Sequence, residues 1–196
     1  MQTRVTRRRV GRAEREQQIL DAAVEVFTER GFQNASMDAV AERVGVTKPV
    51  LYTHFGSKDG LLLACIARAR AELLEATTAA VAAADGAEDM MRSGIRAFFD
   101  YIDSQGPAWM IGYSEPLIAG AAIEAVRAQQ TDFLATLLAA HKPDADPQRL
   151  EAWAQIIVGA CERLALWRNT REISAAEATE YVMDLAWTGL SGAPSE

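Results

Sequence analysis

The pattern of apolar and polar positions predicts a chain built of helices. Apolar residues recur at intervals of three and four, a spacing that places them on one face of an α-helix. Leu20, Ala23 and Phe27 form one such stripe, and glycine and proline stand between the periodic runs. We therefore expect an all-α fold, with irregular structure at residues 108–120 and a loop at 142–147. The predicted helices span about residues 12–30, 36–44, 48–55, 57–84, 88–105, 121–141, 148–168 and 174–190.

The stretch from Ser36 to Lys58 predicts two short helices joined by a glycine turn. Ser36 can cap the first helix with its hydroxyl. Gly45 follows where the chain must enter a left-handed conformation, which glycine adopts without strain. Thr47 is expected to cap the second helix, and Pro49 suits its first turn because no N–H is needed there. This arrangement is typical of a helix-turn-helix, whose second helix enters the DNA major groove.

Donors to phosphates or base edges gather on the outer face of the second short helix. Leu51 and Phe55 lie one turn apart and are expected to point inward. No acidic residue interrupts residues 47–58, whereas a solvated face would mix both signs of charge. Paired short helices also occur in proteins that never touch DNA, so a helical scaffold or partner-binding protein is the alternative. The residues predicted to contact DNA are Ser36, Thr47, Lys48, Pro49, Tyr52, Thr53, His54 and Lys58.

Lys58 stands in the first turn of the next predicted helix, directly after its expected N-cap, Ser57. A cation at this end of a helix opposes the helix dipole. One explanation is a DNA phosphate held jointly by the ammonium and by backbone N–H groups. The alternative is a lysine whose side chain extends into solvent.

These residues resemble the TetR family of bacterial one-component repressors. The matching stretch runs roughly from Ile19 to Leu62 and includes RGF after the first helix and the run LYTHFGSKDGLL. It covers about the first third of the chain by motif, and the remainder only by helical character and length. The resemblance implies a homodimer that binds a palindromic DNA operator and releases it when a small-molecule effector binds.

Charge is distributed unevenly along the chain. The 196 residues carry a net charge of −7, but residues 1–60 hold ten basic and eight acidic residues, against ten and nineteen in the remainder. This asymmetry favours a basic DNA-binding module attached to an acidic domain. We expect a flexible basic arm at 1–12, a helix-turn-helix domain at 13–58, and a helical effector-binding and dimerisation domain at 59–196. In the arm, Arg7, Arg8 and Arg9 either lie along the DNA or keep the terminus soluble.

Two further sets of residues are predicted to give the C-terminal domain its function. Aromatic side chains from different helices either form an ordinary core or surround a cavity, and the resemblance favours a cavity for a lipophilic or aromatic effector. The last two long helices are apolar on more than one face, so one face is expected to pack against a twin subunit. The predicted pocket residues are Phe98, Ile102, Trp109, Tyr113, Phe133, Leu137, Trp153 and Ile157. The resemblance implies that these two helices form a four-helix interface with those of the twin subunit, and the residues carried over to it by helix order are Ile156, Arg163, Trp167, Tyr181, Leu185 and Trp187.

No enzyme signature accompanies these features. The chain lacks a glycine-rich phosphate loop, a nucleophile elbow, a zincin helix and paired cysteines. Cys65 and Cys161 are expected to be buried structural thiols, and no metal or cofactor is expected. The arginine-rich start is not followed by the apolar core of a signal peptide, and no apolar run is long enough to cross a bilayer. We therefore expect a cytoplasmic regulator, with an all-α enzyme acting on a small lipophilic molecule as the less favoured alternative.

Overall fold

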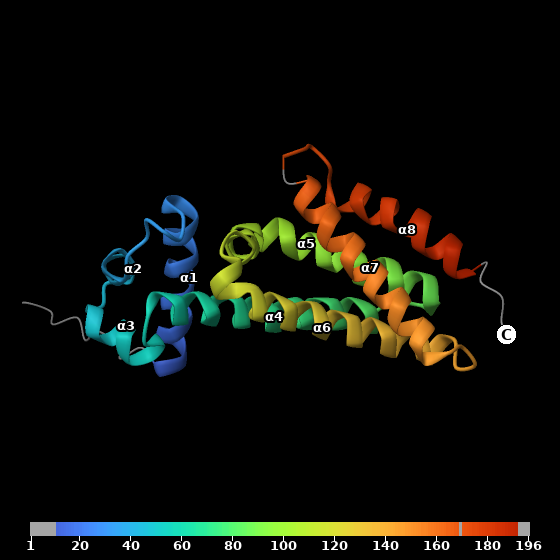
Figure 1. The fold of residues 1–196 in the computed structure, drawn as a ribbon, viewed down its shortest axis with the longest axis horizontal. Helices are drawn as coiled ribbons and strands as arrows, with labels where there is room; N and C mark the ends of the chain where they lie inside the picture. Colours follow the sequence, from blue (N-terminus) through green and yellow to red (C-terminus); the bar gives the residue numbers. More distant parts are fainter. Residues whose placement is uncertain (1–10, 169, 192–196) are drawn as a thin grey trace, which may run out of the picture.

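The computed structural model describes residues 11–168 and 170–191, except for the side chains of residues 106–110, 190 and 191. Across these ranges every regular element is an α-helix, which confirms the predicted fold class. Nearly all of the predicted basic arm, including Arg7, Arg8 and Arg9, lies outside the described residues. The helices are α1 (Arg12–Arg30), α2 (Met37–Val44), α3 (Lys48–Phe55), α4 (Lys58–Ala82), α5 (Gly86–Ser114), α6 (Pro116–His141), α7 (Pro147–Arg168) and α8 (Ala175–Ser191) (Figure 1).

The helices form two units that share α4. Helices α1 to α3 pack together at one end of the molecule, and α4 leads from there into the larger unit (Figure 1). α4 contacts α1 and α3 of the first unit and α5 and α6 of the second. Within the second unit α5 packs on α8 and α6 packs on α7. The boundary predicted between residues 58 and 59 therefore falls in the first turn of a helix common to both units.

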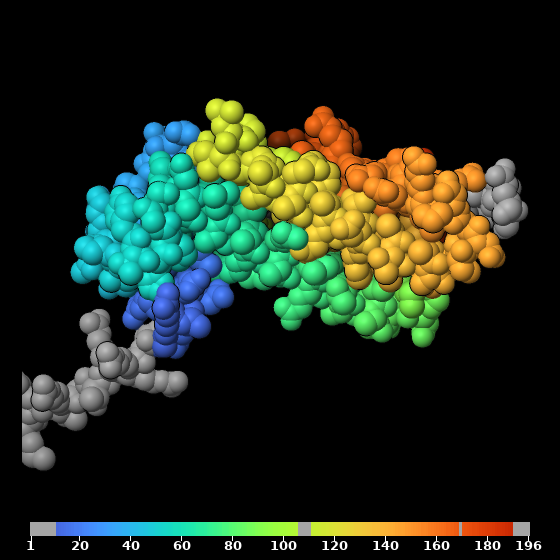
Figure 2. Space-filling model, turned by 60° about the horizontal axis from the view of Figure 1, so that its bottom comes forward, coloured from blue at the N-terminus to red at the C-terminus, as the bar shows by residue number. Residues whose placement is uncertain are grey.

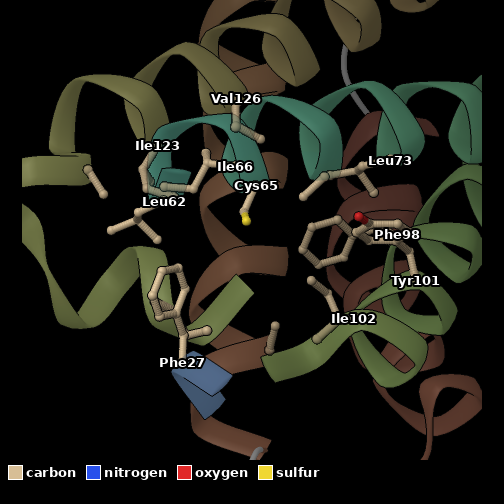
Figure 3. Close-up of a cluster of buried hydrophobic side chains, with 14 of the residues drawn as sticks. Phe27, Leu62, Cys65, Ile66, Leu73, Phe98, Tyr101, Ile102, Ile123 and Val126 are labelled. Atoms are coloured by element: carbon tan, nitrogen blue, oxygen red, sulfur yellow. The ribbon is translucent and has the colours of Figure 1, made fainter. Parts of the chain in front are cut away.

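One connected core runs through both units. Figure 3 shows Phe27 of α1 in the same cluster as Leu62 and Ile66 of α4 and Val126 of α6. Leu62 and Leu73 are 1% and 0% exposed, so the inner face of α4 lies in this core. Because close-packed side chains transmit displacements, the first unit is not mechanically independent of the second.

Local sequence signals explain the helix-turn-helix. The Ser36 hydroxyl accepts a hydrogen bond from the Ala39 N–H, as predicted, and Gly45 adopts the left-handed conformation with φ 74° and ψ 37°. Thr47 occupies the N-cap position of α3, as predicted, but its side chain makes no capping hydrogen bond. Pro49 explains the difference, since it occupies one of the two positions whose N–H a capping side chain would normally accept.

The prediction of an irregular segment at residues 108–120 is wrong. α5 continues past Pro107 to Ser114, and α6 begins almost directly afterwards. Proline inside a helix removes one hydrogen bond and bends the helix but need not end it. Buried Ile102 before the proline and Ile111 after it hold the helix on the core. The end of α5 is seen nearly end-on in Figure 1, unlike the rest of that helix.

A capping box precedes α8. Ser174 and Glu177 form a reciprocal capping box before α8, with the Ser174 N–H donating to the Glu177 carboxylate at 2.9 Å and the Glu177 N–H donating to the Ser174 hydroxyl at 3.2 Å. The Ser174 hydroxyl also donates to this carboxylate at 2.7 Å, and the two hydrogen bonds from the Ser174 hydroxyl and N–H lower the pKa of Glu177.

Cys65 and Cys161 are both buried and unbridged, and burial raises the pKa of each thiol to about 12. In the part of the chain described, no helix combines the length and apolar character needed to cross a bilayer.

Candidate nucleic-acid interface and effector region

The outer face of α3 is open to solvent. Leu51 is 0% exposed and anchors the helix, whereas Tyr52 is 45% exposed on the opposite side. Phe55 is half-buried against the core, as predicted, and the neighbouring His54 ring is half-buried beside it, with 5.8 Å between the ring centroids. The remaining predicted contact residues on this side, namely Ser36, Thr47, Lys48, Pro49 and Thr53, are exposed.

A carboxylate from α2 reaches the same face. Lys48 Nζ lies 2.7 Å from Asp38 Oδ2, and both side chains are largely exposed. The hydrogen bond and the charge of Asp38 raise the pKa of Lys48. The absence of acidic residues between 47 and 58 therefore does not describe the whole face, because Asp38 comes from a different helix. An acidic residue in the first turn of α2, where the helix dipole favours it, was the signal available in the sequence.

The Lys58 ammonium contacts the loop between α1 and α2. Its Nζ donates to the carbonyl oxygens of Phe32, Gln33 and Ala35 at 2.8, 3.3 and 3.1 Å. The same atom lies 4.4 Å from the centroid of the Phe32 ring. An ammonium has three N–H donors, so these acceptors use all of them. The carbonyl groups offset the unfavourable helix dipole, and in this structure the side chain does not extend into solvent.

Ion pairs hold α2 against α1. The Arg43 guanidinium lies 2.6 Å from a Glu29 oxygen and 2.8 Å from a Glu25 oxygen. The paired carboxylates raise the pKa of Arg43, and the guanidinium in turn lowers the pKa of Glu29. All three groups are largely exposed, so these contacts orient α2 more than they stabilise the fold.

A small cavity of about 70 Å³ lies between α4, α5, α6 and α7. This volume holds only a few water molecules. The structure therefore lies between the two predicted alternatives, an open effector cavity and a filled core. The predicted pocket residues that line the cavity are Phe98, Phe133, Leu137 and Ile157.

Three of the other predicted pocket residues, Ile102, Tyr113 and Trp153, do not line this cavity. Ile102 packs in the shared core (Figure 3), and Trp153 lines a groove between α7 and α8. Tyr113 is half-buried near Glu162, and burial, followed by the charge of Glu162, raises the pKa of its hydroxyl. The side chain of Trp109 lies outside the described part of the structure. At Ile102, Tyr113 and Trp153 the pocket prediction differs from the structure, because a large apolar or aromatic residue on a helix does not show which neighbour it will face.

Two polar residues in the cavity wall were not predicted. Glu162 is 7% exposed and accepts a hydrogen bond from Arg127 Nε at 2.9 Å. Gln130 also lines the cavity, and its buried Nε2 has no hydrogen-bond partner among the described residues. Both residues lie on long, largely apolar helices, and the sequence does not distinguish them from surface positions.

A second cavity of about 260 Å³ adjoins the first. Met90, Met91, Leu134 and Leu137 line both of them. Trp187 lines this second cavity and not the α7–α8 groove, so the structure places it apart from the other predicted interface residues.

An apolar groove of about 570 Å³ runs between α7 and α8. Ile156 and Leu185 on its two sides are 66% and 82% exposed, which is unusual for residues of this kind. A monomer rarely leaves such large side chains together in water. The predicted interface residues that line the groove are Ile156, Arg163, Trp167, Tyr181 and Leu185.

Together, an exposed recognition helix, a helix shared by two units and a helical domain with internal cavities define a one-component DNA-binding regulator. The family described as "Bacterial regulatory proteins, tetR family" matches residues 19–65, and "Tetracyclin repressor-like, C-terminal domain" matches residues 87–189. The chain therefore belongs to the TetR family of bacterial transcriptional regulators, and it is a DNA-binding regulator rather than an enzyme.

Individual relatives agree with this assignment. The chain is 32% identical over 192 residues to the HTH-type transcriptional activator FasR of Mycolicibacterium smegmatis, covering 95% of this chain and 87% of the relative. A TetR-like transcriptional regulator from Rhodococcus sp. RHA1 has 34% sequence identity and a TM-score of 0.74, over 94% of this chain and 100% of that one. A regulator from Pseudomonas aeruginosa PAO1, at 18% identity and a TM-score of 0.80 over 94% of both chains, shares the fold.

Proposed function

We propose that this regulator binds a palindromic operator as a homodimer and responds to a small lipophilic or aromatic effector in its C-terminal domain. DNA binding is supported by the two faces of α3. Leu51 on one face is buried in the core, whereas Tyr52 on the other face is exposed to solvent. Paired recognition helices read half-sites about one DNA turn apart, so a dimer follows from the same helix.

Five of the predicted contact residues have a proposed partner on DNA. Thr47 and Lys48 approach base edges or neighbouring phosphates, and Pro49 packs on a sugar or on a thymine methyl group. Tyr52 and His54 fix the helix on the phosphate backbone. The Thr53 hydroxyl already donates to the Pro49 carbonyl at 2.8 Å, so α3 offers few free groups for reading bases. Part of the sequence preference would then come from DNA shape.

The α7–α8 groove is the proposed dimer interface. Packing Ile156 and Leu185 of one subunit against the same face of its twin would remove both from water. Four helices, two from each subunit, would then surround the two-fold axis. In this arrangement Trp187, which faces the second cavity, would contribute to the effector region of its own subunit instead.

The two adjoining cavities are the proposed effector region. Their walls are apolar, and Glu162 and Gln130 supply polar groups that would orient a ligand. The first cavity must widen to admit a molecule of drug size, and this movement would displace α4 and the recognition helix. We propose repression that the effector relieves. Because the M. smegmatis relative is named an activator, a reporter assay with and without the effector decides the direction of control.

Selection from a random duplex library tests the DNA-binding part. The unmodified protein should enrich a palindrome, and Tyr52→Ala with His54→Ala should weaken its binding at least about tenfold while the circular dichroism spectrum is unchanged. Arg96→Ala, which removes an exposed positive charge from α5, is the matched control and should bind normally. A scaffold protein would enrich no duplex, or would tolerate the double substitution.

A thermal-shift screen of small lipophilic compounds tests the effector part. A true effector should raise the unfolding temperature and change operator affinity by roughly 5- to 150-fold. A compound that stabilises the protein and leaves operator affinity unchanged would show that occupying the cavity is not coupled to DNA binding.

A further inference from the structure

Residues 31–35, which lie between α1 and Ser36, the N-cap of α2, form a loop that is held from several sides. Phe32 is buried and its ring packs edge-on against Phe27, with 5.2 Å between the centroids. The Ala35 N–H donates back to the Gly31 carbonyl at 3.1 Å. Ser36, the cap of α2, follows directly, so the position of this loop determines where α2 begins.

The position of α2 in turn determines the position of α3. The Val46 N–H in the turn donates to the Ala41 carbonyl at 3.0 Å, and Lys48 at the start of α3 pairs with Asp38 on α2. Any displacement of loop 31–35 is therefore passed through α2 to the recognition helix.

Lys58 fastens this loop to α4. Its three hydrogen bonds to the carbonyl groups of Phe32, Gln33 and Ala35 span most of the loop. Hydrogen bonds from a charged donor are about twice as strong as neutral ones, and two of these three are partly shielded from water. A phosphate could recruit this ammonium only by breaking them.

The same loop is held from the C-terminal domain. The Gln33 side-chain amide donates to Glu115 Oε2 at 2.7 Å, and Glu115 separates α5 from α6. In Figure 2 the yellow junction of α5 and α6 lies beside the light-blue region around this loop. Gln33 is thus bound by Lys58 through its backbone and by Glu115 through its side chain.

We propose that Lys58 is a positioning residue for operator recognition, which ties α4 to loop 31–35 and so fixes α2 and α3, and that it does not contact DNA phosphate. Loop 31–35 is then the segment through which both α4, by Lys58, and the α5–α6 junction, by Glu115, contact the helix-turn-helix. The DNA part of this inference rests on the proposed function, whereas the mechanical part does not.

The affinity of the Lys58→Met variant for DNA distinguishes a positioning role of Lys58 from a direct contact with phosphate. With the selected operator, affinity should fall about tenfold, because α3 is no longer held in register. Affinity for a random duplex and the slope of log affinity against log salt should stay unchanged. Loss of a phosphate contact would instead weaken both duplexes and reduce the slope by about 0.9 for each protomer. That result, or unchanged operator affinity, would overturn the proposal.

Two controls accompany this variant. Lys58→Arg keeps the charge and several donors, and it should recover most of the specific affinity. Lys48→Met removes an exposed lysine from the predicted DNA face, and it should lower the salt slope where Lys58→Met does not.

A measurement without DNA tests the mechanical part if no operator is selected. Hydrogen exchange of the Ala35 and Ala39 amides should accelerate at least about tenfold in Lys58→Met, while amides in the middle of α7 are unaffected. Equal exchange in both proteins would contradict the proposal. If Lys58→Met does not fold, the ammonium ¹⁵N–¹H signal of Lys58 in the unmodified protein serves instead. It should be protected before a duplex is added and unmoved afterwards, and a signal that is protected only with DNA would exclude the inference.

Discussion

At the scale of single residues, Gly60 occupies a position where a side chain does not fit. A Cβ atom added there would lie 2.1 Å from the Phe55 carbonyl oxygen. Gly60→Ala must therefore move the turn between α3 and α4, and it should cost about 1–3 kcal/mol of unfolding free energy. Urea unfolding followed by circular dichroism measures this cost.

Gly120 provides the matched control for this substitution. It lies inside α6 with no atom near the position of an added Cβ. Gly120→Ala should stabilise the protein by about 0.5–1 kcal/mol, because alanine loses less conformational entropy in a helix. Equal effects of the two substitutions would show that the close approach at Gly60 is not important.

Asp38 forms an ion pair with Lys48, a residue predicted to contact DNA. Its carboxylate neutralises Lys48 in the free protein, so DNA binding must first break this pair or share the ammonium. Asp38→Asn should raise affinity for any duplex several-fold at low salt and steepen the salt dependence, because one more charge is available to release counterions. Fluorescence anisotropy at several salt concentrations measures both quantities. Unchanged binding would mean that Lys48 does not approach the DNA.

At the scale of elements, a buried arginine joins the end of α7 to α5. Arg168 is 5% exposed, lies 2.5 Å from Asp103 Oδ1, and donates to the carbonyl oxygens of Phe99 and Ile173 at 3.2 and 3.0 Å. Its guanidinium carbon also lies 5.1 Å from the centroid of the Phe99 ring. These contacts orient the end of α7 relative to α5.

Arg168→Met should therefore be strongly destabilising. The substitution keeps the apolar stem but removes the donor to one buried and one partly buried carbonyl group and the partner of Asp103, and it should cost about 2–4 kcal/mol. Arg96, which forms an exposed pair with Asp100 within α5, is the comparison, and Arg96→Ala should cost less than about 0.5 kcal/mol. Chemical denaturation of both variants decides whether burial makes the difference.

At the scale of the whole molecule, the α7–α8 groove should decide the oligomeric state. Leu185→Glu would place two charges inside a two-fold interface, so the variant should sediment as a monomer at micromolar concentration and lose most operator affinity. Leu117 is 101% exposed at the start of α6, and Leu117→Glu is the matched control that should remain dimeric. A dimer that survives Leu185→Glu would place the interface elsewhere.

The continuous core also limits how the molecule can respond to an effector. α4 packs on both units and carries the Lys58 tie at its first residue. A ligand that spreads the wall of the small cavity acts on α4 directly through Thr77 and Val81, which line it. The two units therefore move as connected bodies, and no flexible linker separates them.

The sequence determined the parts of this protein that depend on neighbouring residues. Ser36, Gly45 and the pair of Ser174 and Glu177 define helix ends because their hydrogen bonds close within a few residues. The inward direction of Leu51 and the outward direction of Tyr52 follow from helical spacing alone. The helix-turn-helix was therefore predictable almost residue by residue.

The tertiary structure decided what depends on contacts between distant residues. The acceptors of Lys58 lie 23 to 26 positions away, and Glu115 lies 82 positions from Gln33, so no local pattern reveals either contact. For the same reason α5 continues past Pro107, since packing on a core assembled from other helices outweighs one lost hydrogen bond. Helix ends are set by short-range hydrogen bonds, whereas the role of a charged side chain depends on which helix folds beside it.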